Sequence, residues 1–228
     1  MTPAEQSRRA AAICALAPVV PVLVIEDLAH AKPLARALIN GGLPALEVTL
    51  RTPIALDVIR AMSEIEGGVV GAGTLLTRQD VKNAKAAGAT FGVSPGATDR
   101  LIEACEDEGL PLLAGAVTAS EVMALLERGY NVQKFFPAES SGGVAAVKSI
   151  GGPLPQVGFC PTGGISLSLA KSYLSLANVL CVGGSWIATK ELLMTNSWDA
   201  IEALAAEAAA LRRYGVRPPQ PAIYAPRA

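Results

Sequence analysis

The sequence predicts a single-domain α/β protein that folds as a (β/α)8 (TIM) barrel, and three observations support this. Eight short apolar runs recur from residue 19 onward. Each is followed by a turn rich in Gly, Pro, Ser or Thr and then by a helical pattern. Strands that alternate with helices form a parallel sheet, and eight such units can close a barrel. An open doubly wound sheet is the alternative, but no G-x-G-x-x-G turn follows the first strand.

The strands are expected where short apolar runs lie between turn residues. They are predicted at residues 19–25, 45–50, 68–75, 89–95, 110–117, 131–137, 156–164 and 178–186. The second strand, "ALEVTL", alternates most clearly. In a barrel its Leu46, Val48 and Leu50 would meet the helices, so that Glu47, Thr49 and Arg51 share the inward face.

The helices are expected between these strands, where apolar residues recur with helical spacing. They are predicted at residues 31–42, 54–68, 79–88, 98–109, 119–129, 142–152, 167–176 and 197–215. Asp99 and Ser120 are expected as N-caps. We divide the chain into an N-terminal helical extension (1–18), the barrel (19–212) and a proline-rich C-terminal tail (213–228).

Composition excludes several classes of protein and partner. The chain is 51% hydrophobic and 17% charged, which excludes general disorder. A net charge of −1 gives no electrostatic basis for binding nucleic acid or an anionic membrane. No segment reaches the roughly 18 apolar residues of a membrane span. Four cysteines without a C-x-x-C pair indicate thiols in a reducing cytoplasm, and a single histidine, His30, makes a His-based metal site unlikely.

Lys134 differs from the other lysines because it lies inside a predicted strand, "NVQKFFP". The other six lie in or beside helical patterns, where a lysine is expected on the solvent-facing side: Lys32, Lys82, Lys85, Lys148, Lys171 and Lys190. One interpretation of Lys134 is a structural ion pair with Glu47. The other is a nucleophilic amine, because burial disfavours the charged form and a neutral lysine forms a Schiff base with a carbonyl compound.

Polar residues on the second strand fit the second interpretation. Glu47 is the deeper residue and Arg51 lies nearer the mouth of the barrel. A carboxylate near an imine-forming lysine can shuttle protons. An arginine at the mouth suits a carboxylate or phosphate because its fork-shaped group donates two hydrogen bonds.

Glycine-rich ends follow the last two strands, in "PTGGIS" (161–166) and "VGGSW" (182–186). The loops after strands seven and eight form the usual phosphate site of this fold. The alternative is that these glycines only allow tight turns. The motif "GAGT" places the hydroxyl of Thr74 at the end of strand three, and "SPG" places the Ser94-Pro95 turn at the end of strand four.

Taken together, these motifs resemble the class I aldolases that act on 2-keto-3-deoxy-6-phosphogluconate (KDPG), of the Entner–Doudoroff pathway, and on 4-hydroxy-2-oxoglutarate (KHG). The resemblance covers about residues 18–210, and its motifs are "LEVTLRT", "VGAGT", "SPG", "KFFPAE", "GGVAA", "FCPTGGIS" and "CVGGSW". It implies a cytoplasmic homotrimeric lyase that needs no metal or organic cofactor. The implied reaction cleaves KDPG to pyruvate and glyceraldehyde 3-phosphate.

The resemblance also implies roles for individual residues. Lys134 would form the Schiff base and Glu47 would act as general acid and base. The residues implied to bind substrate are Arg51, Thr74, Ser94 and Pro95 at the pyruvoyl carboxylate, Phe136 and Thr162 at the reacting end, and Gly163, Gly164, Gly184 and Ser185 at the phosphate.

The chain departs from the family pattern after the fifth strand. It reads "AGAVT" (114–118), with Ala114 and Val117, where the family commonly has a proline and a hydroxyl residue. This departure bears on contacts near the aldehyde portion of the substrate. Two other functions are compatible with the residues alone: a phosphate-binding barrel isomerase or epimerase that uses Glu47 as base, and a non-catalytic binder of sugar phosphates.

Overall fold

The computed structural model describes residues 1–211. The proline-rich tail predicted at 213–228, residue 212 of the predicted barrel and the end of the helix predicted at 197–215 lie outside the described residues.

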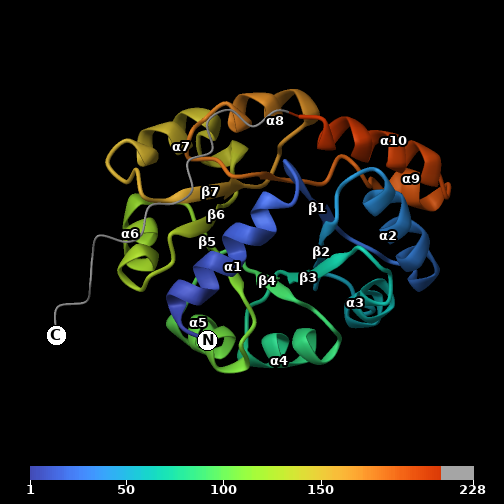
Figure 1. The fold of residues 1–228 in the computed structure, drawn as a ribbon, viewed down its shortest axis with the longest axis horizontal. Helices are drawn as coiled ribbons and strands as arrows, with labels where there is room; N and C mark the ends of the chain where they lie inside the picture. The colour runs from blue at the N-terminus through green and yellow to red at the C-terminus, as the bar shows by residue number, and fades with distance from the viewer. Residues whose placement is uncertain (212–228) are drawn as a thin grey trace.

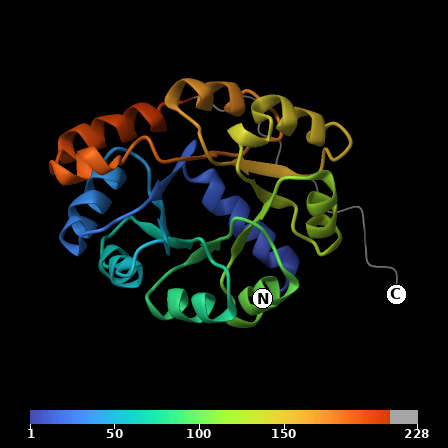
Figure 2. The ribbon, with the colours of Figure 1, turned by 180° about the vertical axis from the view of Figure 1, so that it is seen from behind.

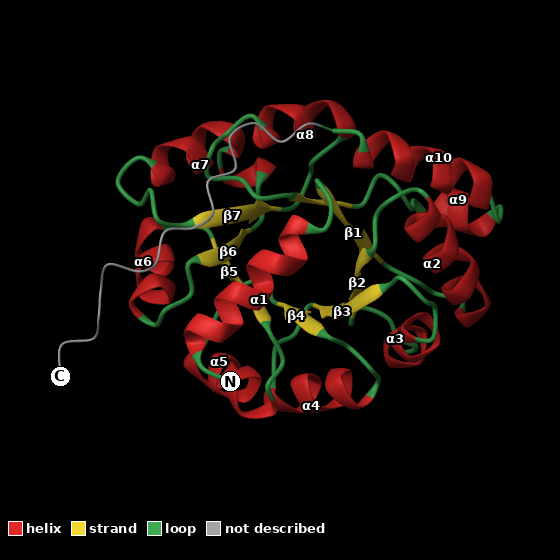
Figure 3. Cartoon of the chain, in the orientation of Figure 1, coloured by secondary structure: helices red, strands yellow, loops and turns green. Residues whose placement is uncertain are grey.

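Eight parallel strands form the inner ring of the fold (Figure 3). They are β1 (Val19–Leu23), β2 (Ala45–Thr49), β3 (Val69–Gly73), β4 (Phe91–Val93), β5 (Leu112–Ala116), β6 (Val132–Phe135), β7 (Gly158–Pro161) and β8 (Val182–Gly184). β8 pairs with β1, and the bridges Phe159–Val179 and Thr162–Gly183 join β7 to β8. The ring therefore closes, which confirms the barrel and excludes the open sheet. Each strand lies inside its predicted run and is shorter than it, because the polar residues at the carboxyl ends of those runs form loops.

The outer ring consists of helices that follow the strands. They are α2 (Ala31–Asn40), α3 (Ala55–Ser63), α4 (Arg78–Ala86), α5 (Asp99–Glu108), α6 (Ala119–Glu127), α7 (Gly143–Gly151), α8 (Leu167–Leu174), α9 (Lys190–Met194) and α10 (Trp198–Ala209). Sequence patterns did not predict α9, whose five residues are too few to show a helical period. No helix within the described part of the chain is long and apolar enough to cross a membrane.

The predicted N-caps were wrong by one and two residues. Thr98 caps α5 and Thr118 caps α6, so that Asp99 and Ser120 lie inside the first turns. Each threonine has an extended backbone, and its hydroxyl accepts a backbone N–H of the first turn. In α6, Glu121 also accepts from the backbone N–H of Thr118, which completes a capping box.

Apolar side chains fill two separate cores. The larger core lies between the strands and the outer helices and includes Leu46 and Val48, with Leu50 packed against it, as the alternation in β2 predicts. The smaller core fills the lower half of the barrel, at the amino ends of the strands. The upper half, at the carboxyl ends of the strands, is thereby left for polar side chains.

The first helix, α1 (Pro3–Ala15), covers the lower mouth of the barrel. It crosses the ring of strands in Figure 1 and is seen through the ring from the opposite side in Figure 2. Its buried Gln6 accepts a hydrogen bond from the backbone N–H of Leu112 at the start of β5, at 2.7 Å. Its buried Ser7 accepts from the N–H of Val132 at the start of β6, at 3.2 Å. Because α1 closes this end, ligands must enter through the other.

Candidate active site

Lys134 and Glu47 meet inside the barrel. Lys134 lies on β6 and Glu47 on β2, which stand on opposite sides of the eight-stranded ring. Their side chains cross the interior, and Lys134 Nζ donates a hydrogen bond to Glu47 Oε1 at 3.3 Å. Lys134 is 5% exposed and Glu47 is 3% exposed. The structure thus brings these two predicted residues into direct contact.

The surroundings of Glu47 act on its protonation in opposite directions. Burial raises the pKa of the Glu47 carboxyl above its ordinary value, while the charges of Lys134 and, more weakly, Arg51 oppose the rise. A carboxyl with a raised pKa exchanges protons at a pH nearer neutrality. The pair therefore places an amine against an ionisable carboxyl in one water-poor space.

Three glycines inside the strands leave room for close neighbours, which are polar side chains at two of them and the backbone of Pro95 at the third. A methyl group added to Gly73 of β3 would lie 2.4 Å from Glu47 Oε1, and one added to Gly183 would lie 2.2 Å from Thr162 Oγ1. At Gly115, beside Lys134 in the β5–β6 register, it would lie 2.3 Å from the carbonyl oxygen of Pro95. Sequence reasoning missed these residues, although glycine inside a strand is itself a signal of close approach.

Arg51 lies at the mouth of the barrel, just beyond β2, and is exposed. Its Nε donates to Thr49 Oγ1 at 3.1 Å, and Thr49 in turn donates to the carbonyl oxygen of Leu23 at 2.8 Å. Thr49 therefore orients the guanidinium and leaves its terminal nitrogens available to an anion. Along the inward face predicted for β2, Glu47 and Thr49 are therefore buried, and Arg51 is exposed at the entrance.

Thr74 at the end of β3 is distinguished by its backbone conformation, and Ser94 after β4 by its burial. Thr74 adopts a φ of +62°, a left-handed conformation that a β-branched residue rarely takes. Such strain costs about 1–3 kcal/mol and is concentrated at functional sites. The Ser94 hydroxyl is fully buried and accepts from the N–H of Gly115 at 3.4 Å, so it supports β5, whereas Pro95 is half-buried.

Phe136 and Thr162 lie next to the lysine. Lys134 Nζ is 5.1 Å from the centre of the Phe136 ring, within range of a cation–π contact. Thr162 is 6% exposed and follows β7, the strand on which Cys160 pairs with Lys134. Both predicted residues therefore border the space above the Lys134–Glu47 pair.

The two glycine-rich ends lie side by side. Thr162 pairs with Gly183, so the Gly163-Gly164 turn after β7 adjoins Gly184, the last residue of β8, and Ser185, which follows it. Gly163 and Gly164 have φ values of +109° and +76°, which glycine adopts at little cost. Gly184 is required for lack of space, because a methyl group there would lie 2.2 Å from the Trp186 ring. Ser185 is exposed.

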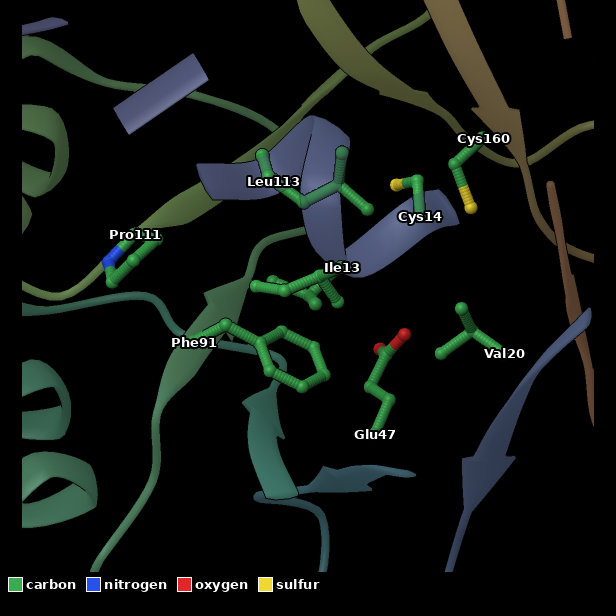
Figure 4. Close-up of a pocket in the computed structure, with 10 residues that line it drawn as sticks. Ile13, Cys14, Val20, Glu47, Phe91, Pro111, Leu113 and Cys160 are labelled. Atoms are coloured by element: carbon green, nitrogen blue, oxygen red, sulfur yellow. The ribbon is translucent and has the colours of Figure 1, made fainter. Parts of the chain in front are cut away.

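A small apolar cavity lies beneath the Lys134–Glu47 pair (Figure 4). The Glu47 carboxylate points into it, between Phe91 and the sulfur atoms of Cys14 and Cys160. None of the four cysteines, all within the described residues, forms a disulfide. The only histidine, His30, packs edge-to-face on Trp198 with ring centres 5.6 Å apart. Within residues 1–211, no group of three His, Cys, Asp or Glu side chains is placed to hold a metal ion.

Comparisons with known proteins agree with this geometry. The model of the family described as KDPG and KHG aldolase matches residues 10–204. The 2-dehydro-3-deoxy-phosphogluconate aldolase of Pseudoalteromonas atlantica is 52% identical over 194 residues, which are 85% of this chain and 90% of that protein.

Two solved structures are also similar. The KDPG aldolase of Zymomonas mobilis ZM4 with 3-phosphoglycerate superposes with a TM-score of 0.86 at 48% identity and covers 92% of this chain and 100% of its own. The KDPG aldolase of Legionella pneumophila, with pyruvate captured as a covalent carbinolamine intermediate, superposes with a TM-score of 0.85 at 44% identity. The match covers 88% of this chain and 98% of that one.

Fold, site and comparisons define a lyase of the class I aldolase type, a closed parallel barrel with a buried lysine and carboxylate in contact. More particularly, the chain belongs to the KDPG and KHG aldolase family.

Proposed function

We propose that this enzyme cleaves KDPG to pyruvate and glyceraldehyde 3-phosphate through a Schiff base on Lys134. The observation that carries the proposal is the 3.3 Å contact between Lys134 Nζ and Glu47 Oε1 inside the closed barrel. A merely structural ion pair would gain little here, since removing two charges from water costs about as much as their attraction returns.

The first half of the reaction joins the substrate to the enzyme. Arg51 and the strained Thr74 hold the carboxylate of the keto acid, which places its C2 carbonyl at Lys134. The neutral amine adds to C2 and gives a carbinolamine. Glu47 donates a proton to the departing hydroxyl, so that water leaves and an iminium forms.

The second half breaks the carbon–carbon bond. The electrons of the C3–C4 bond move into the iminium and leave an enamine of pyruvate, while the C4 hydroxyl gives its proton to the Glu47 carboxylate and becomes the aldehyde of glyceraldehyde 3-phosphate. Glu47 then returns a proton to C3 of the enamine. Water hydrolyses the iminium, releases pyruvate and restores Lys134. Phe136 and Thr162 border the reacting carbons and limit the entry of water.

The phosphate of the substrate is assigned to the joined glycine-rich ends. Gly163, Gly164, Gly184 and Ser185 present backbone N–H groups and a hydroxyl, which suit a phosphate. KHG, which lacks the phosphate, is proposed as a second substrate. In the "AGAVT" departure, Ala114 is buried in the helix-side core, and Val117, just beyond β5, is half-buried and packs against that core. Neither residue therefore adds a side chain to the inward wall of β5, which favours the usual substrates.

Trapping with borohydride tests the reaction type. Incubation with pyruvate and sodium borohydride is expected to add a reduced pyruvoyl group to Lys134, located by peptide mass spectrometry, because borohydride reduces the iminium to a stable amine. An isomerase, an epimerase or a non-catalytic binder would give no adduct. Absence of the adduct, together with absence of pyruvate methyl exchange in heavy water, would overturn the proposal.

We propose a cytoplasmic homotrimer as the working form of the enzyme. Large apolar side chains that are exposed on the single chain, including Leu28, Leu76 and Met194, support an interface between subunits. Buried cysteines without disulfides support a reducing compartment. Sedimentation equilibrium is expected to give three times the 23.4 kDa chain mass. A mass of one or two chains would contradict the trimer.

A further inference from the structure

We propose that Glu139 and Tyr173 are positioning residues that hold the Gly163-Gly164 turn in the shape that binds the substrate phosphate. We call these two side chains the loop brace. The inference deepens the proposed function and rests on it, because it assumes that this turn binds phosphate. Glu139 is the last residue of the "KFFPAE" motif, whose lysine and second phenylalanine already have roles in the site.

The backbone of Glu139 runs alongside the glycine turn. The N–H of Ala138 donates to the carbonyl of Thr162 at 2.8 Å, and the N–H of Glu139 donates to the carbonyl of Gly163 at 3.1 Å. A methyl group on Gly164 would lie 2.9 Å from the β-carbon of Glu139. The turn is therefore pressed against Glu139 along two consecutive residues.

The carboxylate of Glu139 is fixed from the other side by Tyr173. The Tyr173 hydroxyl donates a hydrogen bond to Glu139 Oε1. Tyr173 is fully buried on α8, the helix that the glycine turn enters. Burial and the neighbouring Glu139 carboxylate raise the pKa of Tyr173, so its hydroxyl stays a donor throughout the working pH range. The loop brace thus links the segment after β6 to the helix after β7.

The glycine turn needs such a support. Gly163 and Gly164 both have positive φ values, and glycine has more conformations to lose than any other residue. A phosphate site made of backbone N–H groups binds well only when those groups already point to one place. A charged hydrogen bond at the edge of the turn, out of contact with the reacting carbons, supplies that order.

The test compares Tyr173→Phe and Glu139→Ala with a matched control. Tyr130→Phe is the control, because Tyr130 is also fully buried and donates to a glutamate, Glu106 Oε1, at 3.2 Å. Tyr130 precedes β6 and therefore lies at the closed end of the barrel, away from the glycine turn. Steady-state kinetics are measured with KDPG and with KHG, and borohydride trapping of pyruvate on Lys134 is followed in every variant.

We expect both brace variants to raise KM for KDPG by about three- to tenfold, the scale of one ordinary lost hydrogen bond. Their kcat, their KM for KHG and their pyruvate trapping should match the unmodified enzyme. Glu139→Gln should recover part of the loss because its amide oxygen still accepts from Tyr173. Tyr130→Phe should leave every value unchanged. Ser185→Ala serves as the positive control for phosphate binding.

Other results would overturn the loop brace. Equal losses with both substrates, or the same KM change in Tyr130→Phe, would indicate general destabilisation. An unchanged KM for KDPG in Tyr173→Phe and Glu139→Ala, while Ser185→Ala raises it, would show that the turn needs no brace although the proposed function holds. If Tyr173→Phe folds poorly by circular dichroism, Glu139→Ala and Glu139→Gln decide the matter. Failure of pyruvate trapping in the unmodified enzyme would instead count against the proposed function.

Discussion

Replacement of Lys134 by methionine is expected to lower kcat/KM for KDPG by at least about 10⁴-fold, because the nucleophile of the proposed covalent route is lost. Methionine is of similar length and has no amine, so it fills the space between β6 and β2 without reacting. Cleavage is measured by following pyruvate, and borohydride trapping is expected to leave the variant chain unlabelled.

The same variant is expected to show a new pH dependence of stability. Burial raises the pKa of Glu47, and Lys134 is the main opposing influence. Without Lys134 the pKa of Glu47 rises further above its unfolded value. A carboxyl with a raised pKa in the folded state stabilises the fold below its unfolded pKa, and this stabilisation is lost as the pH rises through the folded pKa.

The difference in unfolding free energy between enzyme and variant should therefore grow as the pH rises from the unfolded pKa of the Glu47 carboxyl through its raised folded pKa, by about 1.4 kcal/mol for each unit of additional pKa shift. Urea denaturation at several pH values measures it. The double variant Lys134→Met with Glu47→Gln should lose this dependence.

Two control variants separate chemistry from charge. Lys134→Arg keeps the cation and its ion pair, so it should be inactive but free of the new pH dependence. Lys32→Met removes a lysine whose 2.7 Å ion pair with Glu64 is on the surface, and it should change neither activity nor trapping. Substantial activity in Lys134→Arg would support the structural ion pair instead of the nucleophile.

The fold was predictable because its local signals agree. Alternation in β2 separates Leu46 and Val48 from Glu47, and the structure places the two sets in the helix-side core and the barrel interior, respectively. Lys134 was recognisable because an ammonium inside an apolar strand needs a special reason. The direct contact of Lys134 with Glu47 needed coordinates, since it spans 87 residues of sequence and the full width of the barrel.

For other residues the sequence does not identify the partner. Gly73 and Gly183 are small because Glu47 and Thr162 occupy the adjacent space, and nothing near them in the sequence identifies these partners. The contact of Tyr173 with Glu139 likewise joins α8 to the segment after β6, across 34 residues of sequence. The hydrogen bond from the Gly115 N–H to the Ser94 hydroxyl also needed coordinates, although a fully buried hydroxyl is expected to have a hydrogen-bond partner.

Glu47→Gln is expected to lower kcat by about 10²- to 10⁴-fold, the usual contribution of a general acid–base residue. Glutamine has the same shape and can still accept a hydrogen bond from Lys134, but it cannot carry a proton. Formation of the iminium should therefore slow, whereas the final extent of trapping on Lys134 should approach that of the unmodified enzyme. Exchange of the pyruvate methyl protons in heavy water should slow by a similar factor.

Gly73→Ala offers a second way to test the role of Glu47, because it moves the carboxylate without removing it. The added methyl group would lie 2.4 Å from Glu47 Oε1, so the carboxylate must swing away from its place beside Lys134. The displaced atoms are the end of a flexible side chain, so the fold should persist. We expect kcat to fall in the same direction as in Glu47→Gln but less far, and the two changes together should cost little more than Glu47→Gln alone. Full additivity, or an unchanged kcat in either single variant, would show that the proton carrier is a group other than Glu47.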